Sequence, residues 1–269
     1  MIAATGGMKV GRSVFNHQTA VVTGAASGIG RAISVMLKSK GVKAVVGLDK
    51  DQAGLSGLAH EIGSHGIVCD VTNRVQVAAA VSEVKATYGK IDILVVAAGI
   101  LQPPPLTLDA VSERQFDRII DVNLKGAWTI LSLAGKEMAA QGSGSIVTIA
   151  SITGLSAGPL VPYGPAKAAL IEMTKSFAGA WGSAGVRVNC VAPGFVETPG
   201  LQRGTAFGLI DVQRLASATA MGRLPMVDEI AEAVCFLASG SASAITGVVL
   251  PVDCGALIMP GFAALNRQD

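Results

Sequence analysis

Seven short runs rich in β-branched residues alternate with amphipathic stretches along most of the chain. The runs are apolar without interruption, as expected of strands that are covered on both faces of a sheet. They span residues 19–24, 43–49, 66–71, 92–99, 144–151, 186–194 and 246–253. The amphipathic stretches include residues 31–40, 74–88, 113–141, 167–181 and 228–238. This order predicts an α/β fold, a doubly wound parallel sheet of about seven strands with right-handed crossovers.

Length and charge limit the number of domains and the kinds of partner. At 269 residues the chain can bury one large core, and no linker divides it. We therefore expect one domain over residues 18–269, preceded by a flexible leader at residues 1–17. Only 15% of the residues are charged and the formal net charge is +2, which favours neither nucleic-acid binding nor a disordered tail. Small molecules or other subunits are the expected partners.

Cysteine spacing and hydropathy indicate the cellular compartment in which the protein is expected. The four cysteines lie far apart and form neither a CxxC pair nor, with the three histidines, a metal-ligand spacing. No metal is therefore predicted, and a reducing, cytoplasmic setting fits best. The first residues lack the apolar core of a signal peptide, and no apolar run reaches the roughly 18 residues of a membrane span. No membrane association is expected.

The first apolar run leads directly into the glycine-rich stretch TGAASGIG, residues 23–30, where a helix is predicted to begin. Glycines at positions 24, 28 and 30 would let backbone N–H groups approach a pyrophosphate, and the helix N-terminus would then face an anion. A tight strand-to-helix turn without a ligand also uses glycine, so both interpretations remain open at this point.

Two carboxylates follow the next runs. Asp49 ends the second run, nineteen residues after Gly30 and close to the usual interval for a group that binds an adenosine ribose. Its charge would repel the 2′-phosphate of NADP, and neither Ser27 nor Lys50 replaces the arginine that would attract it, so NAD is favoured over NADP. Asp70, next to Val71, ends the third run and could meet the adenine amino group. Either carboxylate could instead cap the helix that follows it.

The stretch PYGPAK contains one of only two tyrosines in the chain. Residues i and i+4 share a helix face, so Tyr163 and Lys167 would present a phenol and an ammonium to the same small volume. An interfacial tyrosine beside a solvated lysine is the structural alternative. Pro165 is tolerable only in the first helical turn, where the N–H groups have no intrahelical acceptor.

Together these motifs resemble the short-chain dehydrogenase/reductase family, whose compact members have a single Rossmann-type domain. The resemblance covers residues 18 to about 258. Besides TGAASGIG and YGPAK, it rests on DVNLKG at 121–126, the serine ending IVTIAS at Ser151, and PGFVETP at 193–199.

The resemblance implies a catalytic role for four residues. Tyr163 would be the general acid/base, with Lys167 as the partner whose charge, together with the positive nicotinamide of bound NAD⁺, lowers its pKa. Ser151 would hold the substrate oxygen, and Asn123 would complete a proton relay by linking water to Lys167. Lys167 would also reach the nicotinamide ribose.

The same resemblance implies a set of cofactor-binding positions. They are Gly24, Ser27, Gly28, Ile29, Gly30, Asp49, Asp70, Val71, Ala98, Gly99, Tyr163, Lys167, Pro193, Gly194, Val196 and Thr198. The chain departs from the family pattern at Val96-Ala97-Ala98-Gly99, where an Asn-Asn-Ala-Gly stretch is common. Gly99 is kept, but the side-chain amides that would tie neighbouring strands are gone. Lower sheet stability or weaker cofactor binding would follow.

The expected substrate is a hydrophobic secondary alcohol or ketone, of alicyclic, aromatic or steroid-like type. Segments 101–105, 152–161 and 195–221 would face it, with the apolar residues Leu101, Pro104, Ile152, Leu155, Leu160, Phe195, Leu201 and Phe207. Arg203 could meet an anionic group but more simply faces solvent. The alternatives are a reductase of 3-oxoacyl thioesters, against whose usual NADPH Asp49 argues, and a non-catalytic nucleotide-binding scaffold.

Assembly is also inferred from the resemblance. Family members commonly form homotetramers through their long helices and C-terminal strands, and a homodimer is the alternative. The apolar stretch Ala233–Leu237 and the run VVLPVDCGALIM would suit burial between subunits.

Overall fold

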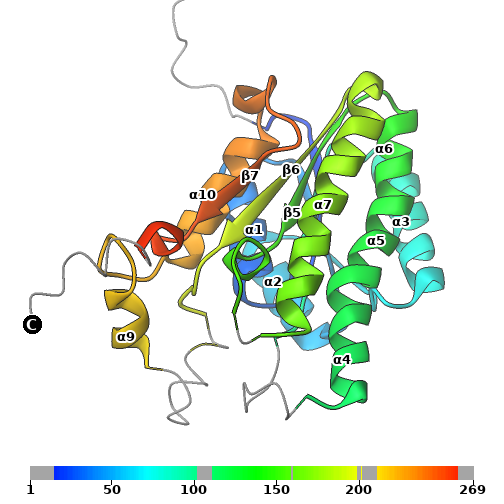
Figure 1. The fold of residues 1–269 in the computed structure, drawn as a ribbon. Coiled ribbons are helices and arrows are strands. Elements are labelled where there is room, and N and C mark those ends of the chain that lie inside the picture. The colour runs from blue at the N-terminus through cyan, green and yellow to red at the C-terminus, as the bar shows by residue number, and fades with distance from the viewer. Residues whose placement is uncertain (1–14, 102–110, 159, 199–200, 202–210, 260–269) are drawn as a thin grey trace, which may run out of the picture.

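A computed structural model describes residues 15–101, 111–158, 160–198, 201 and 211–259. Its seven parallel strands form one sheet in the order β3-β2-β1-β4-β5-β6-β7 (Figure 1). They are β1 Thr19–Thr23, β2 Ala44–Asp49, β3 His65–Val68, β4 Ile93–Val96, β5 Gly144–Ile149, β6 Val186–Pro193 and β7 Val249–Val252. Each predicted run overlaps one of these strands, and only β3 begins before its run, by one residue, so the doubly wound parallel sheet is confirmed. The third run is shorter than expected, because Asp70 and Val71 lie in the loop after β3.

The helices largely follow the predicted stretches. They are α1 Gly28–Ser39, α2 Gln52–Ile62, α3 Arg74–Tyr88, α4 Glu113–Ile120, α5 Ala127–Ile130, α6 Lys136–Ala140, α7 Tyr163–Trp181, α9 Val212–Ser217 and α10 Val227–Ala238. The predicted stretch 113–141 is interrupted by two π-helical turns, η2 Asp121–Gly126 and η3 Leu131–Gly135. Within the described residues, no helix combines the length and the apolar character needed to cross a membrane.

Every strand except the edge strand β3 contributes apolar side chains to both faces of the sheet. In β1, Ala20 and Val22 join the core under α1, α2 and α10, whereas Val21 joins the core under α3, α5 and α7. Figure 1 shows α1, α2 and α10 on one side of the sheet and α3, α5, α6 and α7 on the other. Two buried faces explain why the strands read as uninterrupted apolar runs instead of alternating ones.

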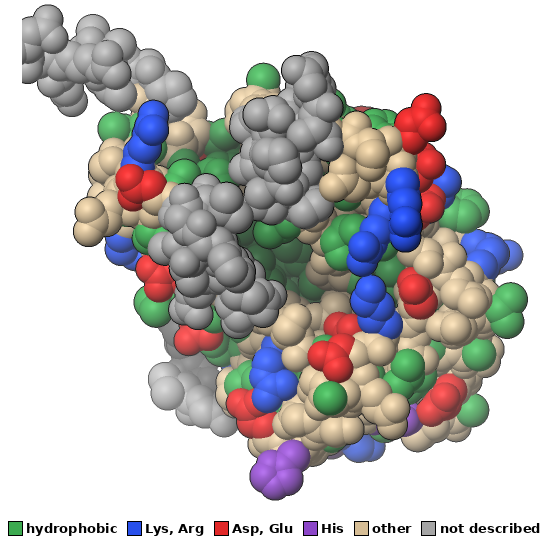
Figure 2. Space-filling model, turned by 90° about the horizontal axis from the view of Figure 1, so that it is seen from below, with side chains coloured by type: hydrophobic (Ala, Val, Ile, Leu, Met, Phe, Trp, Pro, Cys, Tyr) green, Lys and Arg blue, Asp and Glu red, His purple; other side chains and the backbone are tan. Residues whose placement is uncertain are grey.

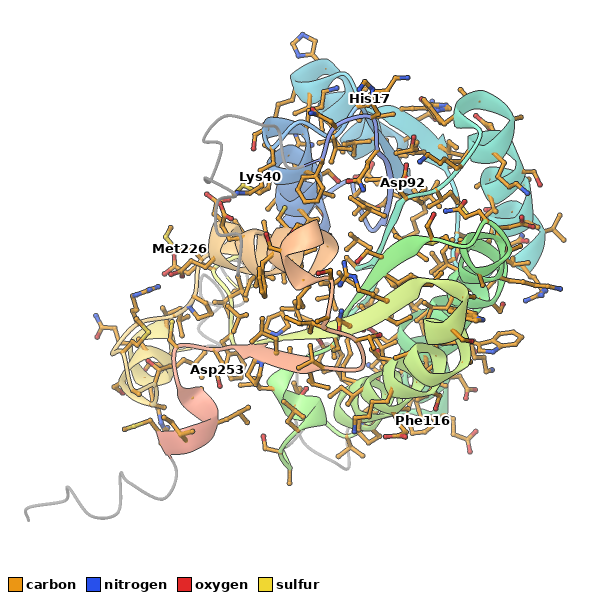
Figure 3. The ribbon with its side chains drawn as sticks, turned by 90° about the horizontal axis from the view of Figure 1, so that it is seen from above. His17, Lys40, Asp92, Phe116, Met226 and Asp253 are labelled. Carbon is orange, nitrogen blue, oxygen red and sulfur yellow. The ribbon has the colours of Figure 1, made fainter. Side chains whose placement is uncertain are left out.

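The order of strands reverses between β1 and β4. Strand β1 pairs with β2 on one side and with β4 on the other, so the crossovers diverge and leave a crevice at the carboxyl ends of these strands. At the amino ends of β1 and β4, Asp92 links the two strands (Figure 3). Its Oδ2 accepts a hydrogen bond of 2.8 Å from the Thr19 N–H, and its Oδ1 forms an ion pair with Lys90.

Helix α10 packs inside the subunit. Val234, Cys235 and Leu237 belong to the buried core shared with α1, and Lys40 at the end of α1 forms an ion pair of 2.8 Å with Glu232. Within Ala233–Leu237, only Phe236 is strongly exposed, at 44%, so packing within the subunit accounts for most of the apolar character of this stretch. The other run predicted for a subunit interface, VVLPVDCGALIM, leaves Val248 and Ile258 exposed at 37% and 65%. The assembly stays a prediction.

Candidate active site

A cavity of about 660 Å³ opens at the carboxyl ends of the strands, beside the reversal point. Figure 2 shows the hollow from that side, with hydrophobic side chains inside it. Every predicted catalytic and cofactor-binding residue lines this cavity, from Gly24 after β1 to Thr198 after β6. The structure thus brings the predicted residues together, while their roles remain predictions.

The turn between β1 and α1 can be built only with glycine. Gly24 has a φ of +71°, and a Cβ there would lie 2.9 Å from the Ala98 Cα. A Cβ on Gly30 would overlap the carbonyl oxygen of Gly24. Ser27 precedes α1 without making a side-chain cap, and the first turn carries no acidic residue. The N-terminal N–H groups of α1 therefore present an uncompensated positive end to the cavity, which suits a pyrophosphate.

Asp49 lies beside this turn at the end of β2. Its Oδ2 accepts a hydrogen bond of 3.1 Å from the Ala26 N–H, and its Oδ1 accepts one of 3.0 Å from the Asp51 N–H. The cap of α2 is Asp51, whose Oδ1 accepts from the Gly54 N–H at 3.1 Å. The capping alternative for Asp49 is therefore wrong. Its carboxylate is held in the cavity with lone pairs left for a ligand.

Asp70 is likewise not a helix cap. Its Oδ1 accepts from both the N–H and the hydroxyl of Thr72, at 2.9 and 2.7 Å, whereas Asn73 caps α3. The hydrogen bond from the Thr72 N–H holds the pKa of Asp70 below its ordinary value. Asp70 therefore presents an ionised carboxylate to the cavity near neutrality.

A threonine does what the missing amides were expected to do between β1 and β4. The Thr23 hydroxyl accepts hydrogen bonds from the Ala97 N–H at 3.0 Å and from the Ala98 N–H at 3.1 Å. It is completely buried and also bonds the Val95 carbonyl at 3.4 Å. The Val-Ala-Ala-Gly stretch therefore keeps a tie to the neighbouring strand, which the sequence interpretation missed.

Tyr163, Lys167 and Ser151 meet at the other end of the cavity. Tyr163 is the first residue of α7, and the Lys167 Nζ lies one turn further on, 5.5 Å from the centre of the Tyr163 ring. Lys167 is 4% exposed, and its Nζ donates a hydrogen bond of 2.9 Å to the Ile149 carbonyl at the end of β5. Ser151, two residues later, lines the same part of the cavity, and its hydroxyl lowers the pKa of the Tyr163 phenol. Pro165 lies in the first turn of α7, as its tolerance requires.

Two glycines bring the turn after β5 into close contact with α7. This turn is η4 Ile152–Gly154, and Ser151 is the residue that caps its start. A Cβ on Gly154 would lie 2.8 Å from both the Ala168 nitrogen and the Lys167 carbonyl carbon, and one on Gly164 would lie 3.1 Å from the Thr153 carbonyl oxygen. Larger residues would separate the turn from the helix. The close contact fixes Ser151 relative to Tyr163 and Lys167.

The pKa values differ from the sequence-based expectation. Burial raises the pKa of Tyr163 to about 12, and the hydrogen bond with Ser151 offsets only part of that rise. Burial also lowers the pKa of Lys167 to about 8, against a smaller opposite effect of Cys190. Desolvation of the phenolate therefore dominates in the protein alone, and a lowering of the Tyr163 pKa by Lys167 together with bound NAD⁺ stays a prediction.

Asn123 lies in the π-helical turn η2 and is completely buried. Its Nδ2 donates to the carbonyls of Ile119 and Ile100, at 3.0 and 2.9 Å, and its Oδ1 accepts from the Ile100 N–H at 3.3 Å. Both hydrogens of the Asn123 amide are therefore used in hydrogen bonds, and only Oδ1 can accept a further one. A Cβ on Gly99 would lie 2.7 Å from that Oδ1 and 3.4 Å from the Lys167 Nζ.

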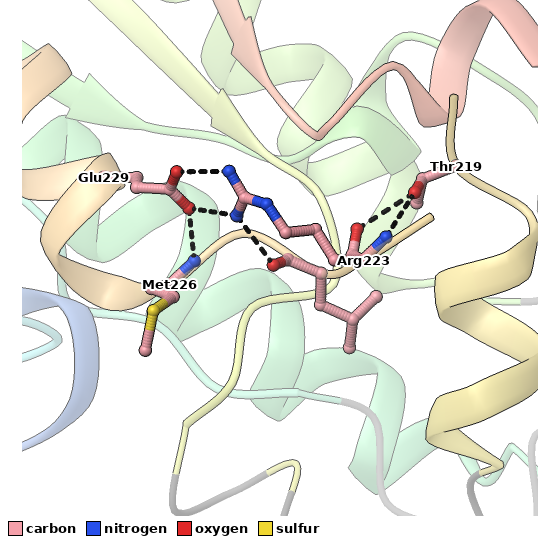
Figure 4. Close-up of polar contacts among 5 residues, drawn as sticks. Thr219, Arg223, Met226 and Glu229 are labelled. Atoms are coloured by element: carbon pink, nitrogen blue, oxygen red, sulfur yellow. Dashed lines mark hydrogen bonds and ion pairs between the residues drawn. The ribbon is translucent and has the colours of Figure 1, made fainter. Parts of the chain in front are cut away.

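The segment after β6 is anchored at its far end by an ion pair (Figure 4). Arg223 binds Glu229 through two hydrogen bonds of 2.7 Å, and Glu229 also accepts from the Met226 N–H at 2.8 Å. Met226 forms a β-bridge with Glu197, which lies between Val196 and Thr198 in the wall of the cavity. This chain of contacts holds the wall in place.

The end of the cavity predicted to face the substrate is lined mostly by apolar side chains. Leu101, Ile152, Leu160, Phe195 and Leu201 line it as expected, but Leu155 is not among the lining residues and is 42% exposed. Pro104, Arg203 and Phe207 lie outside the described residues. Thr153 also lines the cavity and was not predicted. Among the described residues, no three acidic, histidine or cysteine side chains are grouped as metal ligands.

Comparison with known proteins gives a consistent result. The profile of a family described as enoyl-(acyl carrier protein) reductase matches residues 24–256. The chain is 35% identical to the 3-oxoacyl-(acyl-carrier-protein) reductase FabG of Thermotoga maritima, over 88% of this chain and 97% of that protein. It is 38% identical to the cis-4-hydroxycyclohexanecarboxylate dehydrogenase of Sinomonas cyclohexanicum, over 90% of this chain and 97% of that protein.

Solved structures share the fold over almost the whole chain. One named as ribose-5-phosphate isomerase from Brucella melitensis has a TM-score of 0.90 and 46% identity, over 94% of this chain and 98% of that one. An NAD⁺-bound xylitol dehydrogenase has a TM-score of 0.83 and 30% identity, over 90% of this chain and 99% of that one.

Proposed function

The chain belongs to the short-chain dehydrogenase/reductase family of oxidoreductases, and from that membership we propose that it transfers a hydride between NAD(H) and a secondary alcohol or its ketone. The observation that carries the proposal is the meeting of Ser151, Tyr163 and Lys167 in one cavity with the glycine turn of α1. A scaffold that only binds nucleotide would have no use for a buried lysine and phenol beside an open pocket. The scaffold alternative is therefore disfavoured.

The residues of the chain handle the proton. Bound nicotinamide would take up or return the hydride. Tyr163 would accept the alcohol proton during oxidation and return it during reduction, with Ser151 donating a hydrogen bond to the substrate oxygen. Because the pKa of Tyr163 is about 12, the neutral phenol prevails near pH 7 in the protein alone. We therefore expect the oxidation rate to rise with pH, since oxidation needs the phenolate, and the reduction rate to be sustained at neutral pH.

The residues present fit a dinucleotide. The glycine turn has no room for side chains at positions 24 and 30, and the free N-terminus of α1 suits a pyrophosphate. We propose NAD over NADP, because Asp49 places a carboxylate beside that turn where a 2′-phosphate would be repelled. Arg31, the nearest arginine in sequence, is paired with Glu61 of α2 instead of facing the cavity.

The substrate we propose is hydrophobic, of alicyclic, aromatic or steroid-like type, because apolar side chains line the far end of the cavity. The alternative is reduction of a 3-oxoacyl thioester, supported by the name of the Thermotoga relative and opposed by Asp49. An isomerase reaction is not proposed, because it would leave a dinucleotide-shaped turn without a role. We further propose a cytoplasmic homotetramer or homodimer, to be tested by light scattering.

The experiment is a panel of secondary alcohols and ketones, tested with each cofactor. We expect NAD⁺-dependent oxidation of at least one cyclic alcohol, and tighter binding of NADH than of NADPH in fluorescence titration. Turnover confined to 3-oxoacyl thioesters with NADPH would favour the alternative reductase. Tight NADH binding without turnover on any member would favour the scaffold.

A further inference from the structure

The Ser151 hydroxyl has both of its acceptor positions occupied by one neighbour. The Thr153 N–H donates to the Ser151 Oγ at 3.2 Å, and the Thr153 hydroxyl donates to the same oxygen at 2.9 Å. A serine hydroxyl has two acceptor lone pairs and one proton. With both lone pairs filled, Ser151 can only donate. Its single proton is left for the substrate oxygen or, with no substrate bound, for the Tyr163 phenol.

Thr153 is itself held rigidly. It lies in η4, which is closed by a hydrogen bond of 3.0 Å from the Gly154 N–H to the Ser151 carbonyl. The missing side chain of Gly164 leaves room for the Thr153 carbonyl against α7. The branched threonine side chain also has few rotamers. Its hydroxyl is therefore directed at Ser151, which is only 8% exposed.

We propose that Thr153 is a positioning residue that keeps Ser151 in the donor state and so sets the direction of proton transfer. The inference rests on the proposed dehydrogenase function and deepens it. The substrate oxygen, whether carbonyl, alcohol or alkoxide, must accept from Ser151. The alcohol proton then has one acceptor, the Tyr163 oxygen. A serine free to turn would also accept the alcohol proton in a hydrogen bond, and that arrangement leads away from Tyr163.

The test compares Thr153→Val with Thr153→Ser. Valine keeps the branched shape and the backbone N–H but removes the hydroxyl, whereas serine restores it. We expect Thr153→Val to lower kcat for alcohol oxidation about tenfold, the usual effect of one lost hydrogen bond, with the KM for NAD⁺ and the NADH affinity unchanged. The pH profile of kcat/KM, which reports the enzyme without substrate, should move to higher pH, since Ser151 would donate to the Tyr163 phenolate for less of the time. Thr153→Ser should restore both.

A double-mutant comparison separates positioning from folding. If Thr153 acts only through Ser151, Thr153→Val should have no further effect on kcat in a Ser151→Ala background. Thr129→Val is the matched control, since its hydroxyl bonds the Lys125 carbonyl in the helix away from Ser151. It should change neither the rate nor the pH profile.

Two results would overturn the inference. One is an unchanged pH profile and kcat in Thr153→Val, and the other is an equal loss with and without Ser151. In either case, normal NADH binding and loss of turnover in Tyr163→Phe would leave the proposed function intact. Absence of any NAD-dependent turnover in the wild type would instead contradict the proposed function itself.

Discussion

The two ends of the cavity are built from different parts of the chain. At the glycine turn, the ligand-facing surface is largely backbone: N–H groups of α1, with one carboxylate, Asp49, at its side. At the other end, side chains carry the site, and Ser151, Tyr163 and Lys167 depend on the contact between η4 and α7. The glycine turn works because Gly24 and Gly30 have no side chains. The other end works only if the side chains of Ser151, Tyr163 and Lys167 keep their relative positions.

The two ends of the cavity differ in how burial affects the groups that form them. The backbone of the glycine turn carries no ionisable group, so burial has little effect on it. Tyr163 and Lys167 are both displaced by burial toward their neutral forms, with pKa values of about 12 and about 8. Changes at the catalytic end should therefore alter rates and pH profiles, and changes at the glycine-turn end should alter affinity and cofactor choice.

The largest effect is expected for Tyr163→Phe. Loss of the only phenol in the cavity should reduce kcat by a factor on the order of 10²–10⁴, the usual contribution of a positioned proton donor or acceptor. NADH binding should be nearly unchanged in fluorescence titration. The matched control is Tyr88→Phe, since Tyr88 contacts His65 on the α3 side of the molecule. A comparable loss of kcat in both variants would show that the phenol acts through folding.

Next in size is the pH dependence of stability from Lys167. Between pH 8 and 10.5 the unfolded chain binds this proton and the folded chain does not, so the free energy of unfolding should rise with pH. A fall in pKa from 10.5 to about 8 corresponds to about 3 kcal/mol at about 1.4 kcal/mol per unit. Below pH 8 the full penalty of burying the charge remains.

Urea unfolding at several pH values measures this effect. Lys167→Met should lack the rise and should be more stable than the wild type at pH 7, although inactive. Lys175→Met removes an exposed lysine from the same helix and should keep the wild-type pH dependence. Parallel curves for the wild type and Lys167→Met would show that Lys167 titrates normally.

The sequence predicted the two ends to different extents. The glycine spacing and the position of Asp49 follow from local rules, so the glycine turn and the residues of the cavity were identified. The tie from Thr23 to Ala97 and Ala98, and the two bonds from Thr153 to Ser151, depend on which loops meet. No spacing rule fixes that. The raised pKa of Tyr163 in the protein alone was not predicted, because the charge of Lys167 is visible in the sequence and the burial of the phenol is not.

A smaller effect is expected for Gly154→Ala. The added Cβ would lie 2.8 Å from backbone atoms of α7, so η4 must move away, at a typical cost of about 1–3 kcal/mol in unfolding free energy. kcat should fall, because Ser151 moves with the turn.

Gly179→Ala is the control, since Gly179 lies in α7 and a Cβ there would meet open space. It should raise the free energy of unfolding by up to about 1 kcal/mol. Thermal unfolding and kcat measured together would test both. Unchanged kcat in Gly154→Ala would mean that the close contact does not position Ser151.

The smallest effect is a change of cofactor preference in Asp49→Asn. Removing the charge should raise the affinity for NADPH relative to NADH by roughly tenfold, as expected for about 1.4 kcal/mol of repulsion relieved between a carboxylate and a phosphate. Asparagine has a single acceptor oxygen, so one of the bonds from Ala26 and Asp51 is also lost. That loss should weaken the binding of both cofactors equally, and for this reason the ratio of the two affinities is the quantity to measure.

Asp51→Asn is the control, because it retains the cap of α2 and removes a charge near Asp49. It tests whether the position of the removed charge affects the choice of cofactor. If the two variants change the ratio equally, net charge at this end of the cavity, and not the carboxylate held by the glycine turn, decides the choice of cofactor.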